Sequence, residues 1–122
     1  MAFIADRVLD MGLNVLSTEA DVLHICTSEP ADFAAVAGAS VGTKTSLSVG
    51  APAARSPDGR RVTVAQITDG SVTGTDTASH WAIVDSGNSR LLATGALSAS
   101  QAVTDGNTFT LAAFDIGIPG AA

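Results

Sequence analysis

From Val41 to the end of the chain, short runs of alternating hydrophobic and polar residues are separated by turn-forming residues. Residues 56–59 (Ser-Pro-Asp-Gly) are the strongest turn signal, because proline and glycine supply the backbone angles that a tight turn needs. Turns at this spacing, without a regular alternation of strands and helices, predict an antiparallel sheet. We therefore expect an all-β fold, an antiparallel β-sandwich or barrel-like domain with a short N-terminal helix.

The clearest hairpin lies at residues 79–97. Trp81 and Ile83 alternate with smaller side chains along its first strand, and Ser-Gly-Asn-Ser at residues 86–89 suits its loop. We expect three large side chains to anchor the core: Trp81, Ile83 and Phe109. Strands are expected at residues 21–27, 42–49, 61–67, 71–75, 79–85, 90–97 and 108–118, the last with a bend at Gly117. Further turns are expected at residues 68–70 and 104–107.

A short N-terminal helix or helical turn is predicted in the first part of the segment 2–16. Apolar residues recur there at helical spacing, at Ile4, Val8 and Met11. Gly12 is the predicted helix stop. A single helical turn is predicted at residues 30–36, with Ser28 as its cap and Gly38 as its end.

The length of 122 residues indicates one domain, residues 1–122. A chain of this size buries enough surface to fold without a metal ion or a disulfide. The lone Cys26 excludes an intrachain disulfide, and its apolar neighbours indicate a buried thiol without redox function. The first residues lack the basic and apolar segments of a signal peptide, and no apolar run is long enough to span a bilayer. We expect a soluble protein that is made in the cytoplasm.

The net charge of −6 argues against binding to nucleic acid or to an anionic membrane, both of which attract positive surfaces. Only Arg60 and Arg61 are adjacent cations, and two arginines do not make a phosphate-binding patch. We therefore expect neither a nucleic-acid partner nor a membrane partner.

Candidate catalytic and metal-binding residues are few. His24 and Cys26 lie two apart on a predicted strand, where a distant His80 would be needed to join them in a zinc site. Ser79 and His80 are neighbours, which on a strand sends their side chains to opposite faces. The serines lack a Gly-x-Ser-x-Gly motif, and the carboxylates at Asp58, Asp69 and Asp105 are explained by turns. We expect no enzymatic activity, no metal site and no cofactor.

The second half of the chain resembles a known pattern. An aromatic-rich strand ends in aspartate, a Gly/Asn turn follows, a Leu-Leu strand ends in Gly-x-Leu, and a polar turn leads into a final strand with Phe109. The matching residues are 80–85 (HWAIVD), 90–97 (RLLATGAL) and Val103 with 105–109 (DGNTF). This pattern is similar to that of a family of small structural proteins encoded in the morphogenesis regions of tailed bacteriophages. The similarity covers about the last 45 residues well and the first half loosely.

The resemblance implies a component of the virion, where we expect the protein to be located. A small acidic domain without fibrous repeats suits a capsid decoration (cement) protein, whose partners are the major capsid protein and neighbouring copies of itself. The alternative is a tail or tail-tip accessory that binds a receptor, and a sugar-processing enzyme is a third class. Residues expected to contact the shell are Phe3, Ile4, Arg55, Arg60 and Arg61. Phe3 and Ile4 equally suit a plug in the core of the domain itself.

Overall fold

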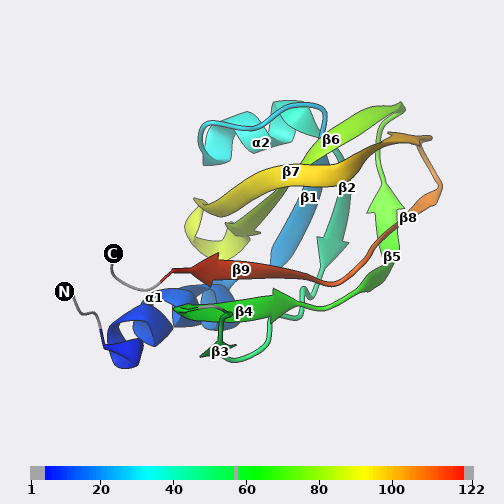
Figure 1. Ribbon diagram of the computed structural model, residues 1–122. Coiled ribbons are helices and arrows are strands. Elements are labelled where there is room, and N and C mark those ends of the chain that lie inside the picture. The colour runs from blue at the N-terminus through cyan, green and yellow to red at the C-terminus, as the bar shows by residue number, and fades with distance from the viewer. Residues whose placement is uncertain (1–4, 57, 120–122) are drawn as a thin grey trace.

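The computed structural model describes residues 5–56 and 58–119 and is mostly β, with 51% of residues in strands and 21% in helices (Figure 1). All strand pairs are antiparallel, as the turn pattern predicted. Strand pairing divides the strands between two sheets. The larger sheet curves into a half-barrel, and the smaller one lies beside α1.

The six-stranded sheet has the order β7-β6-β1-β2-β5-β8. Its strands are β1 (Val22–Cys26), β2 (Ser40–Thr45), β5 (Ile67–Val72), β6 (Asp76–Asp85), β7 (Arg90–Val103) and β8 (Thr108–Leu111). The predicted hairpin is present as β6 and β7, joined by the short 3-10 helix η1 (Ser86–Asn88). β2 ends earlier than predicted because Ser46 adopts a left-handed backbone conformation, with φ of 53°, which a strand cannot continue through.

The three-stranded sheet has the order β3-β4-β9. Its strands are β3 (Ala53–Ala54), β4 (Arg60–Val64) and β9 (Phe114–Ile118). The single strand predicted at residues 108–118 is wrong in one respect. It is interrupted at Ala112 and Ala113, not bent at Gly117, and passes from the large sheet in β8 to the small sheet in β9. The pairing partner changes from β5 for β8 to β4 for β9. This change depends on tertiary contacts, and no turn-forming residues in the sequence indicate it.

The turn predicted at residues 68–70 is also wrong, because these residues lie within β5. The pairing of β5 with β8 shifts register between Ile67 and Gly70, so the strand absorbs the turn-like sequence as a bulge. Gly70 is required there by its neighbour, since the ring of Phe109 fills the space that a Cβ on residue 70 would take. Phe109 is the direct cross-strand partner of Gly70 and is buried.

The first helix, α1 (Asp6–Glu19), runs beyond the stop predicted at Gly12. Leu9, Leu13 and Leu16 lie on one face of it and are buried. A glycine inside a helix costs about 1 kcal/mol, and burial of a leucine side chain contributes about 1.5–3 kcal/mol. The buried leucines on both sides of Gly12 therefore outweigh the tendency of glycine to end the helix.

The second helix, α2 (Phe33–Ala39), confirms a short helix in this region but not its predicted cap. The cap is Asp32, whose Oδ1 accepts a hydrogen bond of 2.9 Å from the backbone N–H of Ala35. Asp32 suits this role better than Ser28 because it immediately precedes the helix. None of the helices among residues 5–56 and 58–119 is long and apolar enough to cross a membrane.

Two hydrophobic clusters lie on opposite faces of the large sheet. The larger one fills the space between the sheet, α1 and the small sheet: Leu13, Leu16, Leu23, Ile25, Val41, Val62, Val64, Ile67, Val72, Ala78, Ile83, Phe109 and Leu111. The smaller one lies under α2: Cys26, Val36, Ala39, Ala82 and Val84. Ile83 and Phe109 are buried, as expected of core anchors. Trp81 differs, since it packs against the larger cluster and yet remains partly exposed.

Candidate functional site

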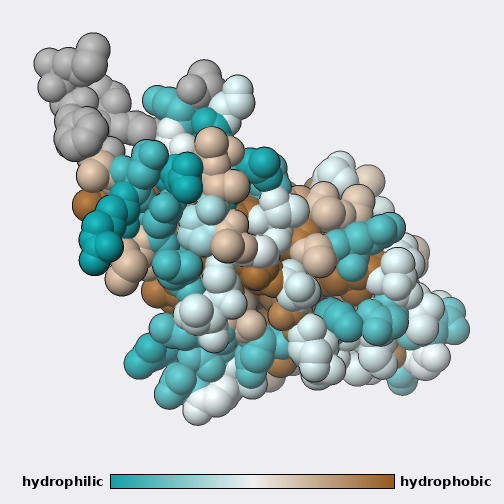
Figure 2. Space-filling view, turned by 90° about the horizontal axis from the view of Figure 1, so that it is seen from below, coloured by the Kyte–Doolittle hydropathy of each residue, from teal (hydrophilic) through white to brown (hydrophobic). Residues whose placement is uncertain are grey.

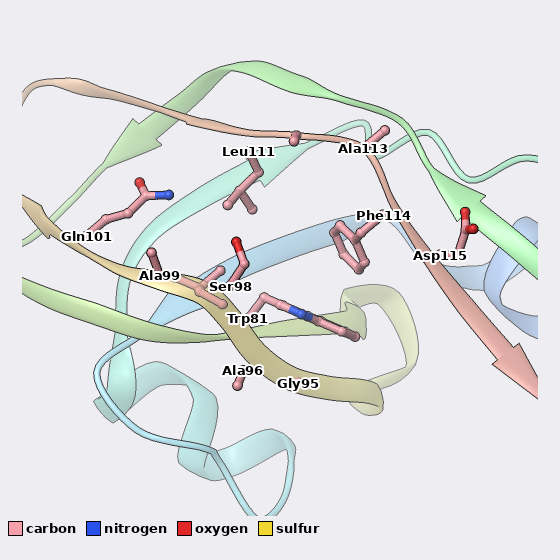
Figure 3. Close-up of a pocket in the computed structure, with 12 residues that line it drawn as sticks. Trp81, Gly95, Ala96, Ser98, Ala99, Gln101, Leu111, Ala113, Phe114 and Asp115 are labelled. Atoms are coloured by element: carbon pink, nitrogen blue, oxygen red, sulfur yellow. The ribbon is translucent and has the colours of Figure 1, made fainter.

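A groove with a volume of about 470 Å³ lies along β7 (Figure 3). One wall is β7 from Gly95 to Gln101, and the other is formed by Leu111, the Ala112-Ala113 link and the start of β9. The two walls come from segments that are adjacent in neither sheet, so the groove is the seam at which the half-barrel remains open. Its volume falls in the range of small-molecule binding sites.

Trp81 and Phe114 form the aromatic part of this groove. Their ring centroids are 4.8 Å apart, and the ring planes are tilted by 40°. The indole of Trp81 also covers Gly95, its cross-strand partner, so closely that a Cβ at residue 95 would lie 2.6 Å from Cζ2. Figure 3 shows Trp81 below and Phe114 above, with both rings directed into the space between the walls. The aromatic surface is thus largely occupied by protein atoms.

The polar groups of the groove are few and mostly satisfied. Gln101 Nε2 donates a long hydrogen bond of 3.4 Å to the carbonyl oxygen of Thr110, which links β7 to β8 across the seam. Asp115 Oδ1 accepts from Arg61 Nη1 at 3.2 Å and from Thr63 Oγ1 at 2.6 Å. The one carboxylate of the groove is therefore compensated by an arginine from β4.

The three arginines expected to contact the shell, Arg55, Arg60 and Arg61, all make polar contacts within the molecule. Arg60 Nε is 2.7 Å from Asp10 Oδ1, and a second bond of 3.3 Å makes the pair bidentate. Arg61 also donates to the carbonyl of Ala54 at 3.0 Å. Arg55 donates to the carbonyl of Asp58 at 3.0 Å and lies 3.5 Å from its carboxylate.

These contacts give the arginines structural roles. The Asp10 hydrogen bond, with burial opposing it, raises the pKa of Arg60 above its ordinary value, and the pair attaches α1 to β4. Arg55, Arg61 and Asp115 line a shallow polar hollow of about 510 Å³. Phe3 and Ile4 lie outside the described residues, so their expected role has no structural counterpart here.

A surface that the sequence analysis missed lies on the outer face of α1. Val8 and Met11 are 63% and 58% exposed, Val15 and Ile118 are also exposed, and Ile118 borders the helix at Gly12. These four residues are the α1 patch. Figure 2 views the molecule from below and shows hydrophobic residues at the surface among hydrophilic ones. Because α1 has leucines on one face and Val8, Met11 and Val15 on another, its sequence carried the signal for two apolar faces.

Ser79 and His80 are hydrogen-bonded, which corrects the expectation that their side chains point to opposite faces. Ser79 Oγ lies 2.8 Å from His80 Nδ1. The pairing of β6 with β7 is irregular at this point, and the local twist of a bulge lets neighbouring side chains meet. Ser79 Oγ donates its single proton to the carbonyl of Thr27 at 2.9 Å, so His80 acts as the donor to Ser79. This direction is opposite to that of a histidine that activates a serine nucleophile.

The residues that were weighed as zinc ligands, His24, Cys26 and His80, do not come together in the structure. Within residues 5–56 and 58–119, no three His, Cys, Asp or Glu side chains come together to hold a metal ion. His24 Nδ1 lies 2.9 Å from Ser40 Oγ. Burial raises the pKa of Cys26 to about 11, so its thiol stays protonated and unreactive at neutral pH.

Comparison with protein-family models, with curated proteins and with solved structures finds no match for this chain. The functional proposal therefore rests on its own residues and geometry.

Proposed function

We propose that this chain is a non-enzymatic structural protein of a tailed-phage virion, and specifically a capsid decoration protein that stabilises the head shell. The strand-and-turn pattern of residues 80–109 supports the virion assignment through its resemblance to small phage structural proteins. The observation that carries the docking role is the α1 patch. Exposed apolar side chains gathered on the outer face of a helix are typical of a surface that binds another protein.

The distribution of charge supports attachment through apolar contact. Arg55, Arg60 and Arg61 are all engaged by carboxylates of the same molecule, which leaves them weak candidates for bridging to a shell. The attachment surface we propose is therefore the α1 patch itself, near the region where the sequence analysis placed shell contacts.

A decoration protein acts by mass action. Copies that bind the assembled shell, but not its broken form, stabilise the shell according to the difference in affinity. A domain of this size presents a standard interface of about 800 Å² to its partner. Stabilisation of a shell then comes from many copies that bind equivalent positions, some of which contact neighbouring copies.

The second candidate function is a tail or tail-tip accessory that binds a receptor. The observation that favours it is the position of Trp81, which lines a groove and is partly exposed instead of fully enclosed in the core. The two candidates differ in copy number: a tail accessory is present in few copies per particle, whereas a decoration protein is present in many.

Quantitative protein gels of purified virions distinguish these candidates. Many copies per particle, together with particles that rupture at lower temperature when the protein is removed, are the results expected of decoration. Few copies, with normal heat resistance and failed adsorption to cells, would instead support the tail assignment. Complete absence from purified virions would rule out both.

The docking surface has its own test in Val8→Ser/Met11→Ser. The double variant should fold normally but should no longer remain with particles during purification. Ala34→Ser/Ala37→Ser is the matched control, because both alanines are exposed on the other helix and should keep particle binding. Normal retention of the α1 variant would show that another surface attaches the domain.

A further inference from the structure

Three strand edges that have no pairing partner face the groove. Among the described residues, β7 pairs only with β6, β8 only with β5, and β9 only with β4. The free edge of a strand presents a row of unpaired N–H and C=O groups, which is a template for one more strand. In Figure 1, β9 runs below β7.

After Arg90, the edge of β7 carries none of the charged residues or prolines that commonly block pairing. Natural edge strands are commonly blocked by lysine, another charged residue or proline. Residues 91–103 contain no charged residue and no proline. The whole chain has a net charge of −6, but these thirteen consecutive residues along the free edge are uncharged. An uncharged partner segment therefore matches this edge.

The middle of β7 is shaped by a large bulge beside the groove. Ala78 pairs with Gln101 and His80 pairs with Ala96, so residues 97–100 stand opposite Ser79 alone. Such bulges bend a strand and redirect its backbone groups, and they concentrate at sheet edges and functional sites. The bulge leaves Ser98 and Ala99 exposed at the wall of the groove.

The seam is bridged at one end and open at the other. The contact of Gln101 with the Thr110 carbonyl joins β7 to β8 by a side chain, where a closed barrel has a ladder of backbone bonds. Beyond this contact, from Gln101 toward Gly95, the groove separates the two walls, and within residues 5–56 and 58–119 no backbone hydrogen bond crosses it. A strand placed there would continue both edges.

The aromatic groups do not suit a sugar ligand. Sugar rings stack on the free face of an aromatic side chain, whereas Trp81 is covered by the Gly95 backbone and by the Phe114 ring. Besides the indole N–H of Trp81, the residues that line the groove offer Gln101, Ser98 and Asp115 as polar side chains, and Asp115 is already bound to Arg61 and Thr63. Backbone pairing over an apolar floor is the better match to this surface.

We infer that the groove accepts an extended, uncharged segment of a different polypeptide chain, which pairs with the free edge of β7 and extends the half-barrel across its seam. This is recognition by strand addition, in which backbone bonds supply affinity and the floor selects small apolar side chains. The inference rests on the proposed function only for the source of the segment, which is a partner chain of the virion.

The isolated full-length protein tests this inference with one defined probe. The probe is a peptide of about seven residues, the length of a typical strand, with alternating valine and threonine. Its ends are acetylated and amidated, so the peptide carries no charge. Trp81 is the sole tryptophan, so its emission reports on the groove. We expect a saturable change of Trp81 emission and slower amide hydrogen exchange at residues 95–101.

The matched probe is the same peptide with N-methyl groups on its central amides, which keeps the side chains and removes the backbone donors. It should bind at least about tenfold more weakly, the effect of losing one or two hydrogen bonds. Ala99→Arg, in the groove wall, should weaken binding by a similar factor. Ala102→Arg, exposed on the same strand outside the groove, should change affinity by less than about twofold, as ordinary surface substitutions do.

Four results would overturn the inference: no saturable response, equal binding of both peptides, full binding by Ala99→Arg, or self-association of the protein that Ala99→Arg abolishes. A response to oligosaccharides without a response to the peptide would overturn it in favour of a sugar site. Peptide binding by a protein that is absent from virions would leave the strand-accepting groove standing and remove the proposed function. Presence in virions without peptide binding would overturn the strand-accepting groove and leave the proposed function standing.

Discussion

Gly95 and Trp81 are direct cross-strand partners, and the indole of Trp81 lies where a side chain on residue 95 would otherwise stand. The same relationship joins Gly70 to Phe109 at the opposite edge of the sheet. A glycine opposite an aromatic residue lets the ring lie flat over the neighbouring strand, a device that also pins the register of the pair. Both edges of the half-barrel are held in this way, and Trp81 thereby becomes part of the groove.

Gly95→Ala should destabilise the protein by about 1–3 kcal/mol, because the added methyl group forces Trp81 to move within a packed environment. The control is Gly38→Ala in α2, where a Cβ meets nothing within 4 Å. That substitution should stabilise the protein by about 0.4–1 kcal/mol through reduced freedom of the unfolded chain. Chemical denaturation measures both, and equal effects of the two would contradict the close contact of Gly95 with Trp81.

Trp81→Ala should lower the free energy of unfolding by about 2–4 kcal/mol, somewhat less than removal of a fully enclosed tryptophan. The ring packs against the larger hydrophobic cluster but remains partly exposed to the groove. Trp81→Phe keeps an aromatic ring over Gly95 and should recover most of the loss. Thermal denaturation of the three proteins provides the measurement, and unchanged stability of Trp81→Ala would assign the ring to ligand contact alone.

Asp10→Asn should loosen α1 from the small sheet, because it removes the charge that holds Arg60 in a bidentate pair. Amide hydrogen exchange in α1 should become faster, with little change in the half-barrel. Asp69→Asn is the control, since it breaks the exposed pair of Asp69 with Lys44 on a different part of the surface. Equal exchange in the two variants would show that the Arg60 pair does not hold the helix.

The stability of the protein should fall as the pH is lowered from 7 to 5, and His24 is one source of this dependence. Burial lowers the pKa of His24 below its ordinary value of 6.5, an effect that the charge of Asp21 partly opposes. The unfolded chain then takes up a proton on His24 before the folded protein does. The contribution is complete above pH 6.5 and is lost as the pH falls toward the lower folded pKa.

Urea denaturation across this pH range measures the effect, and His24→Gln should make the dependence shallower while retaining a partner for Ser40. Asp21 acts in the same direction at lower pH. Hydrogen bonds from the Ser86 hydroxyl and backbone N–H lower the pKa of Asp21, so its stabilising effect is present above its ordinary pKa and is lost as the pH falls through the folded value. A pH dependence of His24→Gln identical to that of the wild type would rule out the assignment to His24.

Removal of metal ions should leave the melting temperature and particle binding unchanged. His24 is hydrogen-bonded to Ser40, His80 to Ser79, and the Cys26 thiol stays protonated by its high pKa. Dialysis against a chelator, followed by thermal denaturation, is the measurement. A lower melting temperature that zinc or calcium restores would contradict this expectation.

Local sequence pattern was sufficient for the mostly antiparallel β class, the N-terminal helix and the hairpin of β6 and β7. Alternation and turn chemistry are properties of neighbouring residues, so they survive without knowledge of the rest of the chain. The same reasoning identified Ile83 and Phe109 as buried, because large side chains in an alternating run occupy the covered face. It also led to the family resemblance, which stays a proposal.

Tertiary contacts decided the features that matter for binding. The chain leaves the large sheet at Ala112, so β8 and β9 serve different sheets and a seam opens beside β7. Asp10 and Arg60 are fifty residues apart in the sequence, yet they form the bidentate pair that attaches α1 to β4. Gly12 continues a helix because leucines on either side of it are buried. Each outcome depends on groups that are distant in the chain and close in space, and local pattern carries no information about such pairs.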